Sequence, residues 1–291
     1  MDEVVLPIFY IVDTLSEIID KEKNIIKSSS VGRKRNITKS ELISICILFH
    51  FSGYRNFKRF YNYVIKHMHK EFPYLVSYSR FITLMKEIQE DLFHLIILIP
   101  KFLTGNYIID STSIKVCHNK RISSNKIFKG VGKIGKSTMG WFFGLKLHVV
   151  INSLGEIMNF TITKGNIDDR FVVENLTENL IGKLFADKGY ISSKLFKTLW
   201  QVGLHLIHAV KRNMKSKILT KHDSDRLKKR NYIETIFNVL KNNHQIEHTR
   251  HRSPKNCFVN ILSGLAAYSM RKFYDLHFRD MQLGSYFLIN N

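Results

Sequence analysis

The sequence predicts an α/β fold, in which a helical N-terminal region precedes a mixed sheet flanked by helices. In the first hundred residues, apolar side chains recur every three to four positions, which is typical of amphipathic helices. From residue 106 onwards, short apolar runs of strand length alternate with longer amphipathic stretches. Hydrophobic residues make up 44% of the 291 residues, which is enough for one large packed domain with or without a smaller helical one.

Helices are expected in the N-terminal region at residues 5–26, 39–51 and 57–69. Thr38 and Glu41 have the spacing of a capping box at the start of the second helix. The third helix interleaves aromatic and basic residues. That pattern is typical both of a solvated helical bundle and of a helix pair that reads DNA, and no clear helix-turn-helix signature decides between them.

The elements that follow alternate between strands and helices. We expect strands at residues 106–110, 141–152, 155–163, 183–187 and 204–210, and helices at residues 168–180, 193–202, 225–243 and 255–273. Residues 123–137 are rich in Gly and Lys and are expected to form a loop. A hairpin followed by alternating helices and strands predicts a mixed five-stranded sheet with helices on both faces, the order of a ribonuclease-H-like fold. We expect this domain at 104–275, after a helical domain at 1–95 and before a tail at 276–291.

The charge of the chain points to a polyanionic partner. Lys and Arg number 45 against 24 Asp and Glu, a formal net charge of +21. Nucleic acid is the first candidate, because a charge of this size repels itself unless it is matched. A membrane is not expected as the partner, because the longest strongly apolar stretch, residues 92–103, is interrupted by polar residues and too short to span a bilayer. The N-terminus lacks the basic region of a signal peptide, and three isolated cysteines form no CxxC pair, so we expect a cytoplasmic protein.

Three acidic residues lie at positions where α/β proteins carry chemistry. Asp110 ends the first strand of the sheet, Asp187 ends the fourth, and Glu234 lies in the late helix. Reactive groups gather beyond strand ends, where neighbouring strands diverge. Phosphodiester chemistry uses two divalent ions about 4 Å apart, and Mg²⁺ prefers carboxylate oxygens. We therefore expect these three acids to bind two Mg²⁺ (or Mn²⁺) ions and to catalyse phosphoryl transfer. Taken singly, each acid could equally be a cap or a solvated side chain.

Cations accompany the acid of the late helix. Arg230, Glu234 and Lys241 are spaced by four and seven residues, which places them on one face of an α-helix. Three apolar residues fall on a different stripe that can pack into the core: Ile233, Phe237 and Leu240. We expect Arg230 and Lys241 to contact DNA phosphates. An ordinary helix ion pair between Arg230 and Glu234 is the alternative.

A phosphate-loop pattern occurs in the expected loop. Residues 130–137, GVGKIGKS, match GxxxxGK[ST]. Such a loop needs a strand before it and a helix after it, whereas an aromatic, strand-like run follows here. We therefore expect a flexible basic loop that contacts DNA, with Lys136 as one contact.

Two further groups of polar residues allow other interpretations. Asp168 and Asp169 could replace Asp187 as the second acid, although they follow a turn and are expected to cap the next helix. Three histidines have spacings that suggest zinc: His244, His248 and His251. The arginines Arg250 and Arg252 flank them and favour contact with phosphates instead of binding of a cation.

Several long motifs in order resemble one family of transposases. They are IIDSTSIKVCHNKRI, GKSTMGWFFGLKLHVVINSLGEI, GNIDDR, KLFADKGYIS and RNYIETIFNVLKNNHQIEHTRHRS. Over about residues 106–270 the chain is similar to the insertion-sequence transposases of family nine-eight-two, which are DDE transposases with a ribonuclease-H-like catalytic domain. The resemblance implies that Asp110, Asp187 and Glu234 are the catalytic acids. Arg230 and Lys241 match the basic members of a tyrosine–arginine–glutamate–lysine signature, in which Leu227 replaces the tyrosine.

The resemblance also implies a function and partners. A transposase of this kind recognises the terminal inverted repeats of its element, cleaves the DNA ends and transfers them into target DNA. It implies a homodimer in the synaptic complex, a bacterial cell with the protein at the nucleoid, and an N-terminal domain that binds DNA ends. A ribonuclease-H-like endonuclease or resolvase that cuts without joining is the alternative enzyme. A DNA-binding protein without activity is the alternative outside enzymes.

Overall fold

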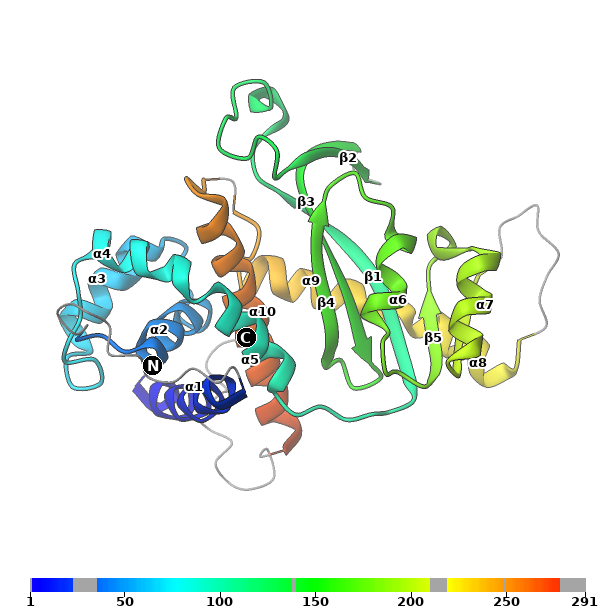
Figure 1. Cartoon of the computed structure of the whole chain (residues 1–291), viewed down its shortest axis with the longest axis horizontal. Coiled ribbons are helices and arrows are strands. Elements are labelled where there is room, and N and C mark those ends of the chain that lie inside the picture. Colours follow the sequence, from blue (N-terminus) through cyan, green and yellow to red (C-terminus); the bar gives the residue numbers. More distant parts are fainter. Residues whose placement is uncertain (1, 23–35, 138–139, 210–218, 249, 278–291) are drawn as a thin grey trace. The chain divides into compact units, whose positions relative to one another are not determined.

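The computed structural model describes residues 2–22, 36–137, 140–209, 219–248 and 250–277 (Figure 1). The chain divides into two compact units. The helical unit comprises the described parts of residues 1–100, 240–246 and 251–291, and the sheet unit comprises those of residues 101–239 and 247–250. Within these described ranges, no helix combines the length and the apolar character needed to cross a membrane.

The helical unit contains the three expected N-terminal helices, although residues 23–26 of the first lie outside the described residues, together with the expected late helix α10 and three further helical segments. Its elements are α1 (Asp2–Glu22), α2 (Lys39–Phe51), α3 (Phe57–His67), α4 (Tyr78–Leu84), η1 (Met85–Glu87), α5 (Gln89–Leu98) and α10 (Pro254–His277). The capping box at α2 is confirmed, since the Glu41 amide donates to Thr38 Oγ1 and the Thr38 amide donates to the Glu41 carboxylate. Helix α2 is buried on nearly all sides and contacts both α1 and α10.

The position of α10 differs from the expected domain boundary. We expected residues 104–275 to form one domain, but α10 belongs to the helical unit, where it packs on α2 and α5. The physical reason is that residues 257–270 of α10 are buried on every side of the helix, so this helix needs partners all around it. Gly264 sits so close to the chain that a Cβ atom there would lie 2.4 Å from the Ile246 side chain.

The sheet unit confirms the predicted α/β class with a mixed sheet (Figure 1). Its strands are β1 (Asn106–Lys115), β2 (Lys133–Ser137), β3 (Gly140–Asn152), β4 (Ile157–Lys164), β5 (Gly182–Ala186) and β6 (Leu204–His208). The strand order is β2-β3-β1-β5-β6, with β4 paired to β3. Strand β1 is antiparallel to β3 and parallel to β5, and β5 is parallel to β6.

The sheet has six strands where five were expected. The additional strand is β2, which lies in the Gly- and Lys-rich segment that we expected to be a loop, and it pairs with the first residues of β3. Glycine makes this pairing possible, because a Cβ atom at Gly135 would lie 2.1 Å from the carbonyl oxygen of Gly165. The phosphate-loop pattern therefore ends in a strand and not at the start of a helix.

Helices and short turns cover both faces of the sheet. They are η2 (Asn119–Arg121), η3 (Asp169–Val172), α6 (Val173–Leu176), η4 (Lys188–Tyr190), α7 (Ser193–Gln201), α8 (Lys221–Lys228), η5 (Lys229–Asn231) and α9 (Tyr232–Asn238). Tyr107 and Ile109 pack with residues of α6 and α7 in one buried cluster. Ile108 points to the other face, where it lines a hollow together with residues of α8, η5 and α9.

The expected helix at 225–243 is divided into several segments. Helix α8, the turn η5 and helix α9 are followed by a π-helical segment, η6 (Val239–Asn243). Because a π-helix has more residues per turn than an α-helix, the α spacing that we assumed between Glu234 and Lys241 does not continue to Lys241.

Candidate functional site

Asp110 and Asp187 lie where β1 and β5 separate. The two strands are paired as far as Ile108 and Phe185, so Asp110 comes two residues after the last pair and Asp187 directly follows the end of β5. We expected Asp110 to end β1, but β1 continues beside β3 to Lys115. It does lie past the end of the pairing with β5, and this divergence of strands opens the space that both carboxylates share.

Arg230 joins these two acids to the acid of α9. Its Nη1 atom donates to Asp110 Oδ2 at 3.2 Å, and its Nη2 atom lies 3.8 Å from Asp187 Oδ1 and 4.0 Å from Glu234 Oε1. Since the last two oxygens share one nitrogen, they are no farther apart than the sum of those two distances. The structure thus gathers the three acids that the sequence singled out around one guanidinium.

The three carboxylates differ in their exposure to solvent. The side chains of Asp187 and Glu234 are 55% and 61% exposed, whereas that of Asp110 is 21% exposed. Burial raises the pKa of Asp110 to about 6, and the nearby Asp187 and Asp169 act in the same direction. The Ser111 amide, which donates to Asp110 Oδ1 at 2.8 Å, and Arg230 favour the ionised form. Asp110 is therefore the inner acid of the group, and its charge depends on neighbouring positive groups.

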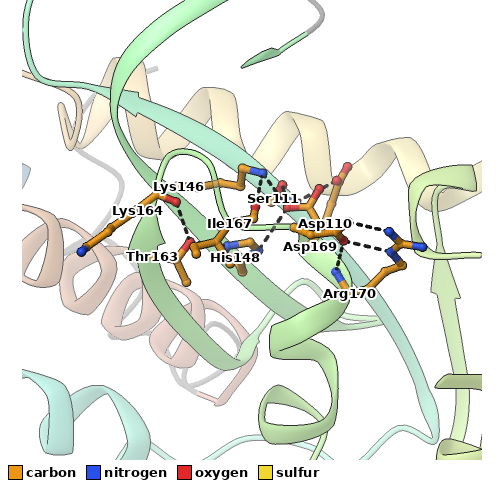
Figure 2. Close-up of polar contacts among 10 residues, drawn as sticks. Asp110, Ser111, Lys146, His148, Thr163, Lys164, Ile167, Asp169 and Arg170 are labelled. Carbon is orange, nitrogen blue, oxygen red and sulfur yellow. Dashed lines mark hydrogen bonds and ion pairs between the residues drawn. The ribbon is translucent and has the colours of Figure 1, made fainter. Parts of the chain in front are cut away.

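A second polar cluster lies on the opposite face of β1, around Asp169 (Figure 2). Asp169 Oδ1 accepts hydrogen bonds from Ser111 Oγ and Lys146 Nζ, both at 3.0 Å, and lies 3.5 Å from His148 Nδ1. Lys146 Nζ also donates to the carbonyl oxygen of Ile167. Figure 2 shows Ser111, Lys146 and His148 turned toward Asp169 from two neighbouring strands.

The register of β1 and β3 explains why these side chains meet. Ser111 pairs directly with His148, and Lys146 is two residues away on the same face of β3. Burial lowers the pKa of His148 to about 4, against the influence of Asp169, so the ring is neutral at neutral pH. Ser111 is therefore a link between the two clusters, since its amide donates to Asp110 and its hydroxyl donates to Asp169.

Comparison with known proteins identifies the family of this chain. Residues 101–254, more than half of the chain, match the family model described as a transposase DDE domain. The chain belongs to this transposase family. It is accordingly a DDE-type enzyme and a DNA transposase, which confirms the enzyme class predicted from the sequence.

A solved structure shares the fold of this transposase. It is the cryo-EM structure of a piggyBac transposase synaptic complex with hairpin DNA, with a TM-score of 0.55 and 10% sequence identity. The match covers 99% of this chain and 76% of that chain. At this identity the likeness concerns the fold, and it supports the predicted ribonuclease-H-like α/β class. A search of the curated proteins finds no match.

DDE transposases generally use divalent metal ions, and the donor chemistry of the site suits such ions. Three carboxylates surround the positively charged guanidinium of Arg230. Two of these carboxylates, those of Asp187 and Glu234, are exposed enough to rearrange. In the described part of the chain, no three His, Cys, Asp or Glu side chains are already arranged around one metal position. The residues therefore fit a divalent cation by chemistry, and Arg230 holds the carboxylates in the arrangement described here.

The other predicted cations of the transposase lie in several elements. Lys136 lies in β2, and its ammonium group is 5.6 Å from the centre of the Trp141 ring. Lys241 lies in η6 and Arg252 precedes α10, both in the helical unit, whereas Arg250 belongs to the sheet unit. Arg230 contacts all three acids.

The structure gives Asp168 and His244 roles other than catalysis and zinc binding. Asp168 caps η3 and pairs with Arg170, and this hydrogen-bonded pair lowers the pKa of Asp168 to about 2. His244 is buried in the helical unit, with its Nδ1 atom 3.3 Å from the carbonyl oxygen of His50. The zinc interpretation of the histidines therefore has no support in the described residues.

Sequence reasoning missed the residues that support Asp110 from the other face. Ser111, Lys146 and His148 carry no motif of their own, and Asp169 was interpreted as a helix cap. Tyr190 was also missed: its buried ring packs in the core cluster, and its hydroxyl lies near Asp169 and Asp110, which contribute with burial to raising its pKa. A partial signal was available, because the alternating pattern of residues 145–149 places Lys146 and His148 on one face of a strand, although it does not show that Ser111 lies beside them.

A hollow lies on the face of the sheet covered by α8 and α9. Its volume is about 850 Å³, and its lining combines the apolar Ile108 and Phe185 with Tyr232, Arg226 and Lys229. Its lining includes Lys229 and Asn231, the residues on either side of Arg230 in η5.

Proposed function

We propose that this transposase cleaves the ends of its own element and joins them to target DNA, with Asp110, Asp187 and Glu234 as the catalytic acids. The observation that carries the proposal is the gathering of these three carboxylates around Arg230 at the divergence of β1 and β5. Phosphodiester chemistry needs clustered oxygen ligands beside a cationic group that can contact a phosphate.

The proposed reaction has two phosphoryl transfers in one site. A water molecule attacks the phosphorus at the end of the element, the bond from phosphorus to the 3′ oxygen breaks, and a free 3′ hydroxyl results. That hydroxyl then attacks a phosphodiester of the target, so one bond forms and one breaks. Two divalent ions, Mg²⁺ or Mn²⁺, would supply the positive charge that activates the attacking oxygen and stabilises the leaving one.

The residues of the chain would hold and orient the reacting groups. Asp110, the least exposed acid, would hold the inner position, while Asp187 and Glu234 would bind from the exposed side. Arg230 would turn from the carboxylates to a phosphate oxygen, for which its planar guanidinium is suited. Lys136, Lys241, Arg250 and Arg252 would contact the DNA backbone.

Several finer features also belong to this proposal. The motifs resemble the transposases of family nine-eight-two, which implies a bacterial insertion sequence, terminal inverted repeats and a homodimer in the synaptic complex at the nucleoid. The helical residues of 1–95 would bind the DNA ends. In support, Lys58 and Arg59 of α3 are exposed at its first turn.

The experiment that tests the proposal uses DNA carrying the terminal repeats found beside the gene. The full chain with Mg²⁺ should release 3′ ends and join them to a target plasmid. Asp110→Asn, Asp187→Asn and Glu234→Gln should each abolish both products, whereas the matched control Asp225→Asn, an exposed acid of α8, should not. Cleavage without joining would show a nuclease or resolvase, and binding without cleavage would show an inactive DNA-binding protein.

The same substrate tests the role of the helical unit. Lys58→Gln with Arg59→Gln should weaken binding to the repeat more than binding to unrelated DNA. Removal of residues 1–95 is a poor test, because α10 packs on α2 and α5 and would lose its partners.

A further inference from the structure

A long segment between Asp110 and Glu156 contains no acidic residue. Residues 111–155 include eight Lys and Arg and no Asp or Glu. Six of these cations, all exposed, lie in what we call the basic arm, residues 118–137 with the paired residues 140–144: Lys120, Arg121, Lys126, Lys129, Lys133 and Lys136. Figure 1 shows the loop that precedes β2 extending away from the sheet, at the end where β3 begins.

The described residues of the basic arm form an ordered structure. Phe128 is fully buried, and its carbonyl oxygen accepts from the amides of Val131 and Gly132. Asn119 Nδ2 donates to the carbonyl oxygen of Trp141 at 2.8 Å, which ties η2 to β3. Residues 133–137 of the arm are held by the pairing of β2 with residues 140–144 of β3. The arm therefore presents its cations on a defined scaffold.

An exposed aromatic side chain lies among these cations. The Trp141 side chain is 61% exposed, although tryptophan is usually largely buried. Lys136 is its direct partner in the β2–β3 register, and the Lys136 ammonium lies over the Trp141 ring. The neighbouring Ile134 is also exposed. A flat apolar ring with an ammonium group beside it matches a nucleotide, which has a flat base beside a phosphate.

The second tryptophan of the chain has a different environment. Trp200 of α7 is 54% exposed, but its ring stacks on His205 at a centroid distance of 4.0 Å and on Phe196 at 5.9 Å. Trp200 therefore has aromatic partners within the chain, and it provides a matched control for Trp141.

We propose that the basic arm binds DNA and that Trp141 stacks on a base while the surrounding lysines contact phosphates. The inference rests on the proposed function, in which DNA is the substrate. Aromatic side chains interleaved with cations are the means by which proteins hold unpaired bases, and apolar side chains can also wedge between base pairs. The absence of acidic residues in the sequence of the arm removes the repulsion that would oppose a phosphate backbone.

The two tryptophans allow a direct spectroscopic test. Trp200→Phe leaves Trp141 as the only tryptophan, and Trp141→Phe leaves Trp200. Each full-length variant is titrated with a 20-nucleotide single strand and with a 20-base-pair duplex, and binding is followed in parallel by the anisotropy of labelled DNA. We expect quenching of the Trp141 emission and little change in that of Trp200.

The outcomes separate this inference from the proposed function. Quenching by the single strand alone would show stacking on an unpaired base, and quenching by both would show that the ring also enters a duplex. DNA that binds with no change in Trp141 emission would overturn the inference, and the transposase activity would remain open to its own test. Because the Trp200→Phe variant keeps Trp141 in place, the deciding measurement does not depend on the folding of a Trp141 variant.

Affinity measurements test the two contributions separately. Trp141→Ala should weaken single-strand binding about tenfold or more, as expected for one lost base stack. Lys133→Gln and Lys136→Gln should each reduce the slope of log affinity against log salt by about one. Lys194→Gln and Lys197→Gln on the exposed side of α7 are the matched controls and should leave the slope unchanged. An equal effect of both lysine pairs would overturn the role of the arm.

Discussion

At the scale of single residues, Asp110 and Arg230 depend on each other. Burial disfavours the charge on Asp110, and the guanidinium of Arg230, which donates to its carboxylate, favours it. Arg230 also lies within 4.0 Å of Asp187 and Glu234, so one guanidinium contacts all three carboxylates. Two consequences can be measured in the absence of divalent metal.

The first prediction concerns the stability of Asp110→Asn in EDTA. Burial raises the pKa of Asp110 to about 6, so the folded protein holds a proton that the unfolded chain releases near pH 4. The stability contributed by this group is present below about pH 4 and is lost as the pH rises through about 6. Asn has no charge to bury, so Asp110→Asn does not lose this stability. Its Tm relative to wild type should therefore rise from pH 5 to pH 8, by roughly 2–4 °C for each kcal/mol of unfolding free energy that wild type loses.

Asp168→Asn is the control with the opposite sign. The hydrogen bonds from Arg170 lower the pKa of Asp168 to about 2, so its contribution is present above the ordinary pKa and is lost as the pH falls through about 2. This variant should melt below wild type across the same range. A Tm of Asp110→Asn that falls further below wild type as the pH rises would contradict the burial of Asp110.

The second prediction concerns Arg230→Ala. The Arg230 side chain is only 15% exposed, and its loss leaves three carboxylates close together. Without metal, we expect a loss of about 1–3 kcal/mol, since a charged hydrogen bond is removed and its partner remains. Added Mg²⁺ should then raise the Tm of Arg230→Ala more than that of wild type, and Arg230→Lys should lie between the two. An equal Mg²⁺ effect on all three proteins would show that Arg230 and the metal do not share the carboxylates.

At the scale of elements, much of the sheet could be predicted because strand length and apolar alternation are local properties. The hairpin of β3 and β4 and the strands β5 and β6 follow from such patterns. Strand β2 could not be predicted, because its Gly135 is explained only by the close approach of Gly165 and by the pairing with β3. The acids could be found from strand ends, whereas the cluster around Asp169 depends on the register of β1 and β3, which no local pattern contains.

The third prediction concerns the link that Ser111 makes between these elements. Its hydroxyl donates to Asp169 across from Lys146, while its amide donates to Asp110. Ser111→Ala removes the hydroxyl alone, so we expect end cleavage to fall about tenfold, the equivalent of ~1.4 kcal/mol in the barrier. The Tm should change little, and Ser111→Thr, which keeps the hydroxyl and suits a strand, should restore most of the rate.

Steady-state measurements of cleavage beside thermal unfolding check this prediction. A rate loss that simply follows the loss of folded protein would mean that Ser111 supports only the fold. Failure of Ser111→Thr to recover would mean that the hydroxyl itself is not the important group. Lys146→Met should have a larger effect than Ser111→Ala, because it leaves Asp169 without its ion pair.

At the scale of the whole molecule, the net charge of +21 is spread over both compact units. The helical unit carries exposed cations in α3, and the sheet unit carries those of the basic arm. Neither set needs the carboxylates in order to bind phosphates. Binding of DNA and reaction on DNA should therefore be separable by substitution, although both would involve the same substrate.

The last prediction follows from this separation of charge. Binding of DNA should weaken steeply with salt, because each lysine or arginine that contacts a phosphate releases a counterion, and six to ten contacts lose about 10³–10⁵ in affinity between 50 and 200 mM salt. Asp110→Asn should bind end DNA at least as tightly as wild type at every salt concentration, since it removes a negative charge that would repel DNA phosphates. Filter binding or fluorescence anisotropy over that salt range, with the cleavage-negative variant beside wild type, gives both results. Affinity that does not change with salt would refute the electrostatic account, and weaker binding by Asp110→Asn would show that its carboxylate contributes to holding DNA as well as to cutting it.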